Sequence, residues 1–507
     1  MKNLTAGPPT RLIVAFTLPL LIGNVFQQVY MFTDAAVVGR LVGLEGLAAV
    51  GASGSVVFLL VGFSWGASAG LAIPVARAFG AGDMAGVRRY TAAGAYASLG
   101  MAVVITVLGV AFAGDILRLL DTPPELMADA TRFLEVTFLG SFTTVAYNFL
   151  ASTIRALGDS RTPLVFLVIS CLLNAVLVVV LVGGTGWGVP GAAAATVFAQ
   201  LAAVAGCVVY VLLRMPALRL SRDDWRAGLR AMGEPLHAGL PMGFQMSVIA
   251  IGALVLQLAV NGLGAVSVAA FTAAMRVDQL ALAPLNSFGV AMVTYVAQNR
   301  GAQEWRRIRV GAFRASLVAG GLAVLLGGVL VLFGGPVAGL FVGPGQEEVV
   351  ALAHQYFLVN GGLYAVLAVL FVLRNTVQGL GLSTVPTVAG LVELVMRSVA
   401  ALVLVEHVGF LGVAMAAPLA WFGGLAPVAV AWARQRRLLL ERERDDAGRA
   451  ASVEGGPGVA APGVAPRVSE AAEALDDAGE AADAPPVAPQ PAGLLATEPA
   501  TGSAPVA

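Results

Sequence analysis

Long apolar stretches separated by short polar connections fill this chain from about residue 12 to residue 432. Each stretch holds roughly 20 residues or more, the length that an α-helix needs to cross a bilayer. Open strand edges have no hydrogen-bond partners in lipid, and the alternating pattern of a β-barrel is missing. The pattern therefore predicts twelve transmembrane helices, at 12–36, 46–72, 90–112, 128–151, 163–184, 190–213, 236–260, 268–296, 312–333, 350–373, 385–405 and 410–432.

The apolar part of the sequence contains an internal repeat. Four positions recur in the same order at an offset of roughly 220 residues, and a duplication explains this better than chance. They are Pro19 and Pro241, Gly80 and Gly301, Gly158 and Gly381, and Gly191 and Gly412. Related halves are common in transporters, with the pathway at the seam between them.

Six spans in each half bring both halves into the membrane from the same side. The two halves are then related by a pseudo-twofold axis along the membrane normal. The fold predicted is an all-α polytopic membrane protein with two six-helix bundles. The N-terminal lobe covers 1–213, a cytoplasmic linker and hinge 214–235, and the C-terminal lobe 236–438. Residues 439–507 form a tail rich in Ala, Pro, Gly, Glu and Asp, and a segment with so few large apolar side chains is predicted to be disordered.

Arginines are unevenly shared between the two sides of the membrane. The connections after even-numbered spans hold most of them, whereas those after odd-numbered spans hold only Arg40, Arg118 and Arg132. The positive-inside rule then places both termini in the cytoplasm, with the chain crossing the cell membrane many times. The formal net charge is +0, so charge gives no argument for a nucleic-acid partner. The lipid bilayer is the predicted surrounding, and a monomer is expected.

Asp34 is the first candidate for chemistry, because it lies on the first predicted span. An intramembrane carboxylate is costly and is treated as functional by default, here as a group that gains and loses a proton. The alternative is a carboxylate near the outer interface that bonds a neighbouring helix. Pro19 lies on the same helix, where it removes a backbone hydrogen bond and permits a bend, so it is a candidate hinge.

Several neutral polar residues lie in the apolar spans of the first half. Each could line a cavity or could simply join helices by a hydrogen bond. Asn174 and Thr196 are candidates for the ion-coupling site with Asp34. The candidates for the substrate cavity in this half are Gln27, Gln28, Tyr30, Tyr147, Asn148 and Gln200.

The second half carries opposite charges close together on two spans. Arg276 and Asp278, and Glu393 and Arg397, are interpreted first as neutralising pairs, with Asp278 also a candidate for the substrate path. The three histidines show no metal spacing, no Walker motif is present, and no constellation suggests a membrane enzyme. No cofactor or metal is predicted, and the energy source is expected to be an ion gradient.

At these motifs the chain resembles the multidrug and toxic compound extrusion (MATE) family, over about residues 4–435. The resemblance rests on LPLLIGNVFQQVYMFTDAAVVGR (18–40), RALGDSRTP (155–163), GWGVPGAAAATVFAQ (186–200) and AAMRVDQLALAPLNSFGVAM (273–292). It implies two bundles that alternate between outward-open and inward-open states and export cationic or amphiphilic drugs or metabolites in exchange for protons or sodium. It also implies that Asp34 is the family's acid on the first helix, Pro19 the proline at which that helix bends, and Asn174 and Thr196 the polar residues around the acid.

The chain departs from the family at Val178, where many members carry an aspartate, and acids that some members carry on the seventh and tenth spans are not evident. One acid favours protons over a sodium site built from two carboxylates. The nearest alternative function is a flippase of the same superfamily that moves a lipid-linked oligosaccharide. A basic cavity would favour it, but the one buried candidate, Arg276, has Asp278 beside it. A major-facilitator transporter shares twelve spans, but its charged loop between spans two and three is not matched here.

Overall fold

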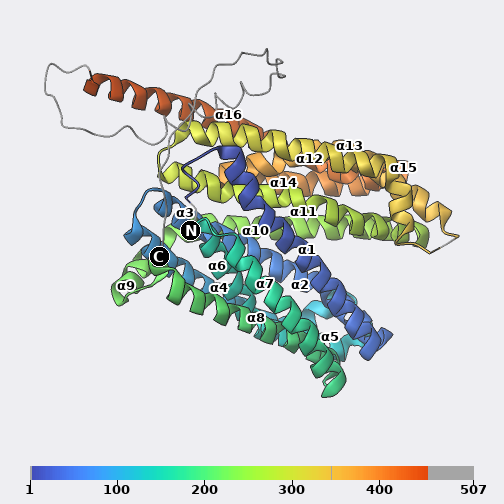
Figure 1. Cartoon of the computed structure of the whole chain (residues 1–507). Helices are drawn as coiled ribbons and strands as arrows, with labels where there is room; N and C mark the ends of the chain where they lie inside the picture. The colour runs from blue at the N-terminus through green and yellow to red at the C-terminus, as the bar shows by residue number, and fades with distance from the viewer. Residues whose placement is uncertain (1–2, 344, 455–507) are drawn as a thin grey trace, which may run out of the picture. The chain divides into compact units, whose positions relative to one another are not determined.

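The computed structural model describes residues 3–343 and 345–454, without the side chains of residues 29, 31–36, 44, 47 and 450–454. Helices form all of the regular structure in this part of the chain (Figure 1). The first repeat contains α1 (Pro9–Leu41), α2 (Leu44–Leu71), α3 (Ile73–Gly80), α4 (Met84–Leu119), α5 (Pro124–Leu139), α6 (Ser141–Ala156), α7 (Arg161–Val178) with a π-helical turn at Val179–Gly184, and α8 (Gly188–Arg214). The linker contains a 3₁₀ turn at Pro216–Leu218 and α9 (Arg222–Arg230). The second repeat contains α10 (Gly233–Asn261), α11 (Ala265–Gly301), α12 (Trp305–Gly339), α13 (Glu347–Gly379), α14 (Thr384–Val399), a π-helical turn at Ala400–Leu404, α15 (Val405–Val408) and α16 (Phe410–Glu454).

The predicted fold of twelve spans in two bundles is confirmed. Eleven helical segments of the described residues are long and apolar enough to cross a membrane. The remaining predicted span, 128–151, is divided between α5 and α6, which have 16 residues each and meet at Gly140. A Cβ at Gly140 would lie 2.0 Å from Val197 of α8, so this break is also a point of close helix packing.

The connection after the second span is helical, which the hydrophobic pattern alone does not indicate. Here α2 ends at Leu71 and the short helix α3 carries the chain on to Gly80. The break falls just before Pro74, which has no backbone N–H to donate to the preceding turn. The corresponding part of the second repeat is one continuous helix, α11, which extends to Gly301.

The two repeats meet through equivalent pairs of helices. α1 packs on α11, and α10 packs on α2. Because α10 is the counterpart of α1 and α11 the counterpart of α2, exchanging the repeats converts one contact into the other. This is the contact pattern that a pseudo-twofold axis produces.

Two repeated glycines bring the bundles together at the end where the arginine-bearing connections lie, which we call the arginine-rich end. A Cβ at Gly80 would lie 1.9 Å from the carbonyl oxygen of Gln298 in the other repeat. A Cβ at Gly301 would lie 1.9 Å from the carbonyl oxygen of Arg77. Only glycine allows backbones to approach this closely, so the duplicated glycine has the same role on both sides of the interface.

The start of the chain packs with the second bundle, although the sequence assigned it to the first. Leu4, Ile13 and Phe16 are buried in the core of the second bundle. The Leu4 backbone N–H donates to Gln298 Oε1 at 3.0 Å, and Asn299 Nδ2 donates to the Leu4 carbonyl oxygen at 3.2 Å. α1 also packs against α7, so it contacts both bundles.

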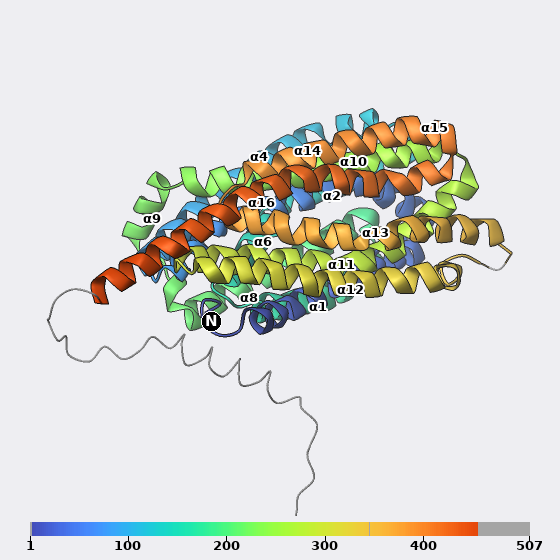
Figure 2. The same ribbon diagram turned by 90° about the horizontal axis from the view of Figure 1, so that it is seen from above.

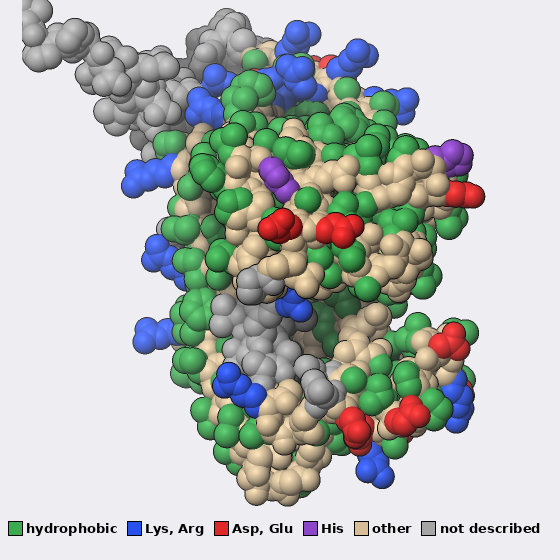
Figure 3. All heavy atoms as spheres, turned by 90° about the vertical axis from the view of Figure 1, so that its right-hand side faces the viewer, with side chains coloured by type: hydrophobic (Ala, Val, Ile, Leu, Met, Phe, Trp, Pro, Cys, Tyr) green, Lys and Arg blue, Asp and Glu red, His purple; other side chains and the backbone are tan. Residues whose placement is uncertain are grey.

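The opposite end of the protein differs from the arginine-rich end. In the space-filling view, the surface at this end is hollowed between the two bundles (Figure 3). The bundles are thus in backbone contact at one end, and a hollow lies between them in the surface of the other.

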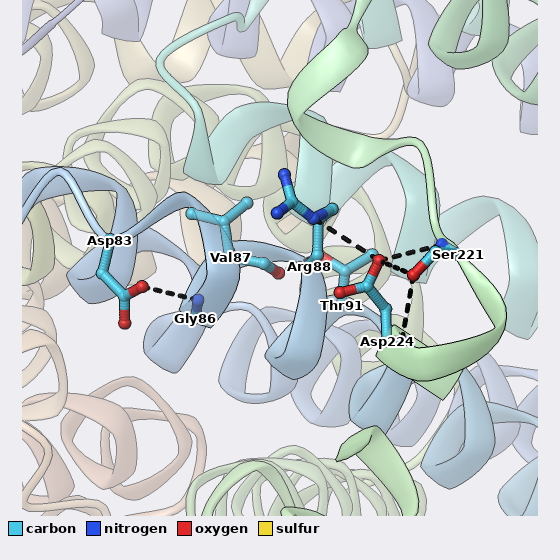
Figure 4. A network of polar contacts seen from close by, with 7 residues as sticks. All are labelled: Asp83, Gly86, Val87, Arg88, Thr91, Ser221 and Asp224. Carbon is cyan, nitrogen blue, oxygen red and sulfur yellow. Dashed lines mark hydrogen bonds and ion pairs between the residues drawn. The ribbon is translucent and has the colours of Figure 1, made fainter. Parts of the chain in front are cut away.

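The linker is docked on the first bundle. Ser221 caps the start of α9 in a capping box with Asp224, and Asp224 Oδ2 lies 3.4 Å from Arg88 Nε on α4 (Figure 4). The rings of Tyr96 and Trp225 meet edge to face with centroids 5.1 Å apart. Within the linker, α9 is therefore held by α4, and the role of 214–235 as a hinge stays a prediction.

The last helix is longer than predicted. α16 lies along α13 and α14 and extends to Glu454 (Figure 2). Arg309 Nε on α12 donates to Glu443 at 3.1 Å, and Trp305 Nε1 donates to Asp446 at 3.0 Å. The prediction of disorder from residue 439 was therefore wrong as far as residue 454, because contacts with α12 hold this polar segment. Residues 455–507 lie outside the described residues.

Candidate functional site

A cavity lies within the first bundle, bordered by α1, α2, α6, α7 and α8, with Val290 of α11 as a contribution from the second bundle. Its wall combines apolar side chains with neutral amides, hydroxyls and one guanidinium. The polar residues that line it are Asn24, Gln27, Tyr30, Thr144, Tyr147, Asn148, Arg155, Ser160, Ser170 and Gln200. The apolar ones include Trp65, Leu164 and Leu167.

One face of α6 supplies a polar stripe along the cavity. Thr144, Asn148 and Arg155 recur at intervals of four and seven residues, which places them on the same side of a helix. The stripe extends for about 16 Å along the helix axis. Thr144 Oγ1 donates to Gln200 Oε1 of α8 at 2.6 Å, which fixes the Gln200 amide in the wall.

A polar cluster joins three helices beside the cavity. Tyr30 of α1, which lines the cavity, shares a hydrogen bond of 2.8 Å between its hydroxyl and Thr196 Oγ1 of α8. Asn174 Nδ2 of α7 donates to the same Thr196 oxygen at 3.2 Å. The structure therefore brings together two residues that were predicted to surround the first-helix acid.

Asp34 belongs to α1, one helical turn beyond Tyr30, but its side chain lies outside the described residues. Its role in ion coupling stays a prediction. Pro19 is buried and lines the cavity, and α1 remains a single helix on both sides of it, so its role as a hinge also stays a prediction.

The other candidates of the first half are placed as follows. Gln27, Tyr147, Asn148 and Gln200 line the cavity, whereas Gln28 is not among the residues of its wall. The Tyr147 hydroxyl donates to the Pro163 carbonyl oxygen at 2.9 Å, which joins α6 to the start of α7.

Sequence reasoning missed Arg155. Arg155 lies after the predicted span 128–151 and so among the arginines of the connection that follows it, yet the structure places it on α6 in the wall of the cavity. The signal available in the sequence was its spacing from Thr144 and Asn148, which indicates a shared helix face.

The charged residues of the second bundle do not pair as predicted. Glu393 of α14 forms an ion pair with Arg374 of α13, both buried, and not with Arg397. Arg374 reaches Glu393 from the neighbouring helix, and this contact between helices replaces the expected pair within α14.

The second predicted pair, Arg276 and Asp278, is also not formed. Residues two apart on a helix point in different directions, and here Arg276 is exposed while Asp278 is 3% exposed. Asp278 accepts a hydrogen bond from the Tyr364 hydroxyl and is not in the wall of the cavity. The prediction that Asp278 neutralises Arg276 was therefore wrong.

No group of three or more His, Cys, Asp or Glu side chains in the described part of the chain could hold a metal ion. Both cysteines are free thiols. Cys171 lies in the cavity wall, and Cys207 is buried.

A family model described as MatE matches the chain twice, over residues 19–180 and 241–403. The chain belongs to the MatE family. The two matches begin at the positions of Pro19 and Pro241, so they support the internal repeat and confirm the resemblance found in the sequence. As a MatE protein the chain is a multi-pass membrane protein, and its relatives are transporters.

Two relatives show how far the likeness extends. The chain is 27% identical over 381 residues to a probable multidrug resistance protein, YpnP, of Bacillus subtilis, covering 75% of this chain and 84% of the relative. It is 23% identical over 426 residues to the probable multidrug resistance protein NorM of Thermotoga maritima, covering 82% of this chain and 89% of that relative.

The fold resembles that of a solved transporter of the MOP superfamily from Pyrococcus furiosus, with a TM-score of 0.79 and 22% identity. The match covers 87% of this chain and 99% of that structure. That transporter is described as having a binding pocket of reverse polarity, which suggests a different function for it.

Proposed function

We propose that this MatE protein exports small amphiphilic drugs or metabolites across the cell membrane by alternating access, in exchange for protons. The observation that carries the proposal is the asymmetry between the two ends of the bundles. Gly80 and Gly301 hold the arginine-rich end in backbone contact, while the surface of the opposite end is hollowed (Figure 3). This is the arrangement of a state that is open on one side only.

The arginine-rich end is assigned to the cytoplasm on the positive-inside rule, so the state described is open to the outside. The polar and apolar wall of the cavity in the first bundle suits amphiphilic molecules, because pockets of this kind bury apolar surface and orient it with a few hydrogen bonds.

Asp34 is proposed as the residue that couples proton movement to transport. Its neighbour on α1, Tyr30, is bonded to Thr196, which also accepts from Asn174. A change in the charge of an acid next to this cluster would alter the contacts among α1, α7 and α8. A proton is favoured over sodium because Val178 is apolar and fully buried, and so offers no second carboxylate.

The test is dye efflux from proteoliposomes under an imposed proton gradient, with Asp34→Asn as the variant. We expect the variant to lose gradient-driven efflux, because an amide cannot carry the proton. Asp115→Asn is the matched control, since Asp115 is an acid near the end of α4 in an exposed pair with Arg118. The control should transport like the unaltered protein.

Three outcomes would each contradict a different part of the proposal. Efflux that persists in Asp34→Asn removes Asp34 from coupling. Efflux that collapses without sodium but survives an uncoupler excludes protons as the coupling ion. Failure of the unaltered protein to move any of a panel of amphiphilic dyes under either gradient contradicts export itself.

A further inference from the structure

Arg155 has no acidic partner among the described residues, although it is only partly exposed and lies in the wall of the cavity. Its Nη2 donates to Ser152 Oγ at 2.9 Å, and none of the ion pairs found in the described part of the chain includes it. Most of its five N–H donors therefore remain for whatever occupies the cavity.

The nearest acid in the sequence is engaged elsewhere. Asp159 Oδ1 accepts from the backbone N–H groups of Arg161 and Thr162 at 3.0 Å each, which caps the start of α7. Its Oδ2 accepts from the Thr162 hydroxyl at 2.6 Å. Asp159 is thus a structural cap.

A guanidinium in a partly apolar cavity is costly unless water or an anion solvates it. Its planar fork matches a carboxylate, which can accept two parallel N–H bonds. The rest of the cavity wall suits the rest of an amphiphile, with Trp65, Leu164 and Leu167 as apolar side chains and Asn148 as a neutral hydrogen-bonding group.

The position of Arg155 places such an anion near the arginine-rich end of the protein. The next residue, Ala156, accepts a hydrogen bond at its carbonyl oxygen from Gln298 Nε2 of the second bundle at 2.7 Å. Arg155 therefore lies next to a contact that joins the two bundles at the arginine-rich end.

We propose that Arg155 binds the carboxylate of an amphiphilic substrate, so that the cavity prefers a ligand with a free carboxylate over an otherwise identical ligand without one. This inference rests on the proposed function, because it takes the cavity to be a transport site, but it concerns binding and can be tested without a gradient.

The experiment compares two dyes that differ only at one carboxyl group. Rhodamine B carries a free carboxylate, and rhodamine B ethyl ester has the same cationic ring system with that carboxylate blocked. Dissociation constants for both are measured by fluorescence anisotropy with the purified full-length protein in detergent. The unaltered protein should bind rhodamine B about 10-fold more tightly than the ester, as expected for a hydrogen-bonded charge.

Arg155→Gln should remove this preference and leave the affinity for the ester unchanged within about twofold, whereas Arg155→Lys should retain part of it because the charge remains without the fork. Arg161→Gln is the matched control, since it removes an equal charge from an exposed position near the end of the same connection. The ratio of the two dissociation constants is informative even if a variant is less stable, because both dyes report on the same folded fraction.

Equal affinities for the two dyes in the unaltered protein would overturn the inference, as would no binding of either. A preference for rhodamine B that survives in Arg155→Gln, or a loss of both dyes in parallel, would also overturn it. None of these results bears on gradient-driven export, which the efflux assay measures separately.

Discussion

Replacing Gly80 or Gly301 by alanine should weaken the closure of the arginine-rich end. The added Cβ would lie 1.9 Å from a carbonyl oxygen of the other repeat, and side-chain carbons essentially never approach closer than 3.0 Å. The backbones must therefore separate by about 1 Å or more at the point of contact. Because the obstacle is backbone on a packed helix, no side-chain rotation can relieve the overlap.

The magnitude follows from the cost of overpacking. Inserting a methyl group into a well-packed contact costs about 1–3 kcal/mol. If opening the interface relieves the whole overlap, the ratio of closed to open molecules falls roughly 5- to 150-fold. The double variant Gly80→Ala with Gly301→Ala should cost less than the sum of the two, because one opening movement relieves both contacts.

Spin-label distance measurements can follow this opening. Labels on cysteines at Ala85 and Glu304, which are exposed on either side of the interface, would report the separation in a background without Cys171 and Cys207. Gly320→Ala is the control, because its Cβ would meet no atom within 4 Å. Distance distributions that are the same in Gly80→Ala, Gly320→Ala and the unaltered protein would refute the claim that these glycines hold the end closed.

Two further predictions concern the linker and the second bundle. Burial raises the pKa of Asp224, but hydrogen bonds from Ser221 and Arg88 and the charge of Arg88 outweigh it and leave the pKa below its ordinary value. The carboxylate therefore stabilises the docked linker above its unfolded pKa of about 3.9 and loses this effect as the pH falls through the lower folded value. Trp225 emission should shift to the red in this acid range, and a pH profile that is unchanged in Asp224→Asn would count against the pair. Glu393→Gln should destabilise the protein by about 3–5 kcal/mol, because it leaves the Arg374 guanidinium buried without its partner. Thermal unfolding measures this loss of stability, and the double variant Arg374→Met with Glu393→Leu should recover it. The control Asp223→Asn, in the exposed pair with Arg226, should have little effect on stability.

The candidate site was only partly predictable. The polar residues of the apolar spans could be found because each interrupts a run that lipid would otherwise favour, and Gln27, Tyr30, Asn148 and Gln200 do lie in one cavity wall. Arg155 was missed because an arginine near a span boundary is read as a topology signal.

The charge pairs of the second bundle show a related limit. Glu393 and Arg397 have the spacing of an ion pair within a helix, but Glu393 forms its ion pair with Arg374 of α13. Spacing in the sequence describes neighbours on one helix, and the sequence holds no comparable rule for neighbours on different helices.

The sequence by itself determined the class of fold, the number of spans and the duplication, because these depend on the length of apolar runs and on recurring residues. It also marked Gly80 and Gly301 as equivalent. Only the tertiary structure decided why they are glycines, which is that each lies against the backbone of the other repeat. The same holds for the docked linker and for α16 beyond residue 438, whose polar sequences gain their order from contacts with α4 and α12. Local pattern sets which segments become helices, whereas contacts between residues far apart in the chain set where those helices meet and which polar groups face a cavity.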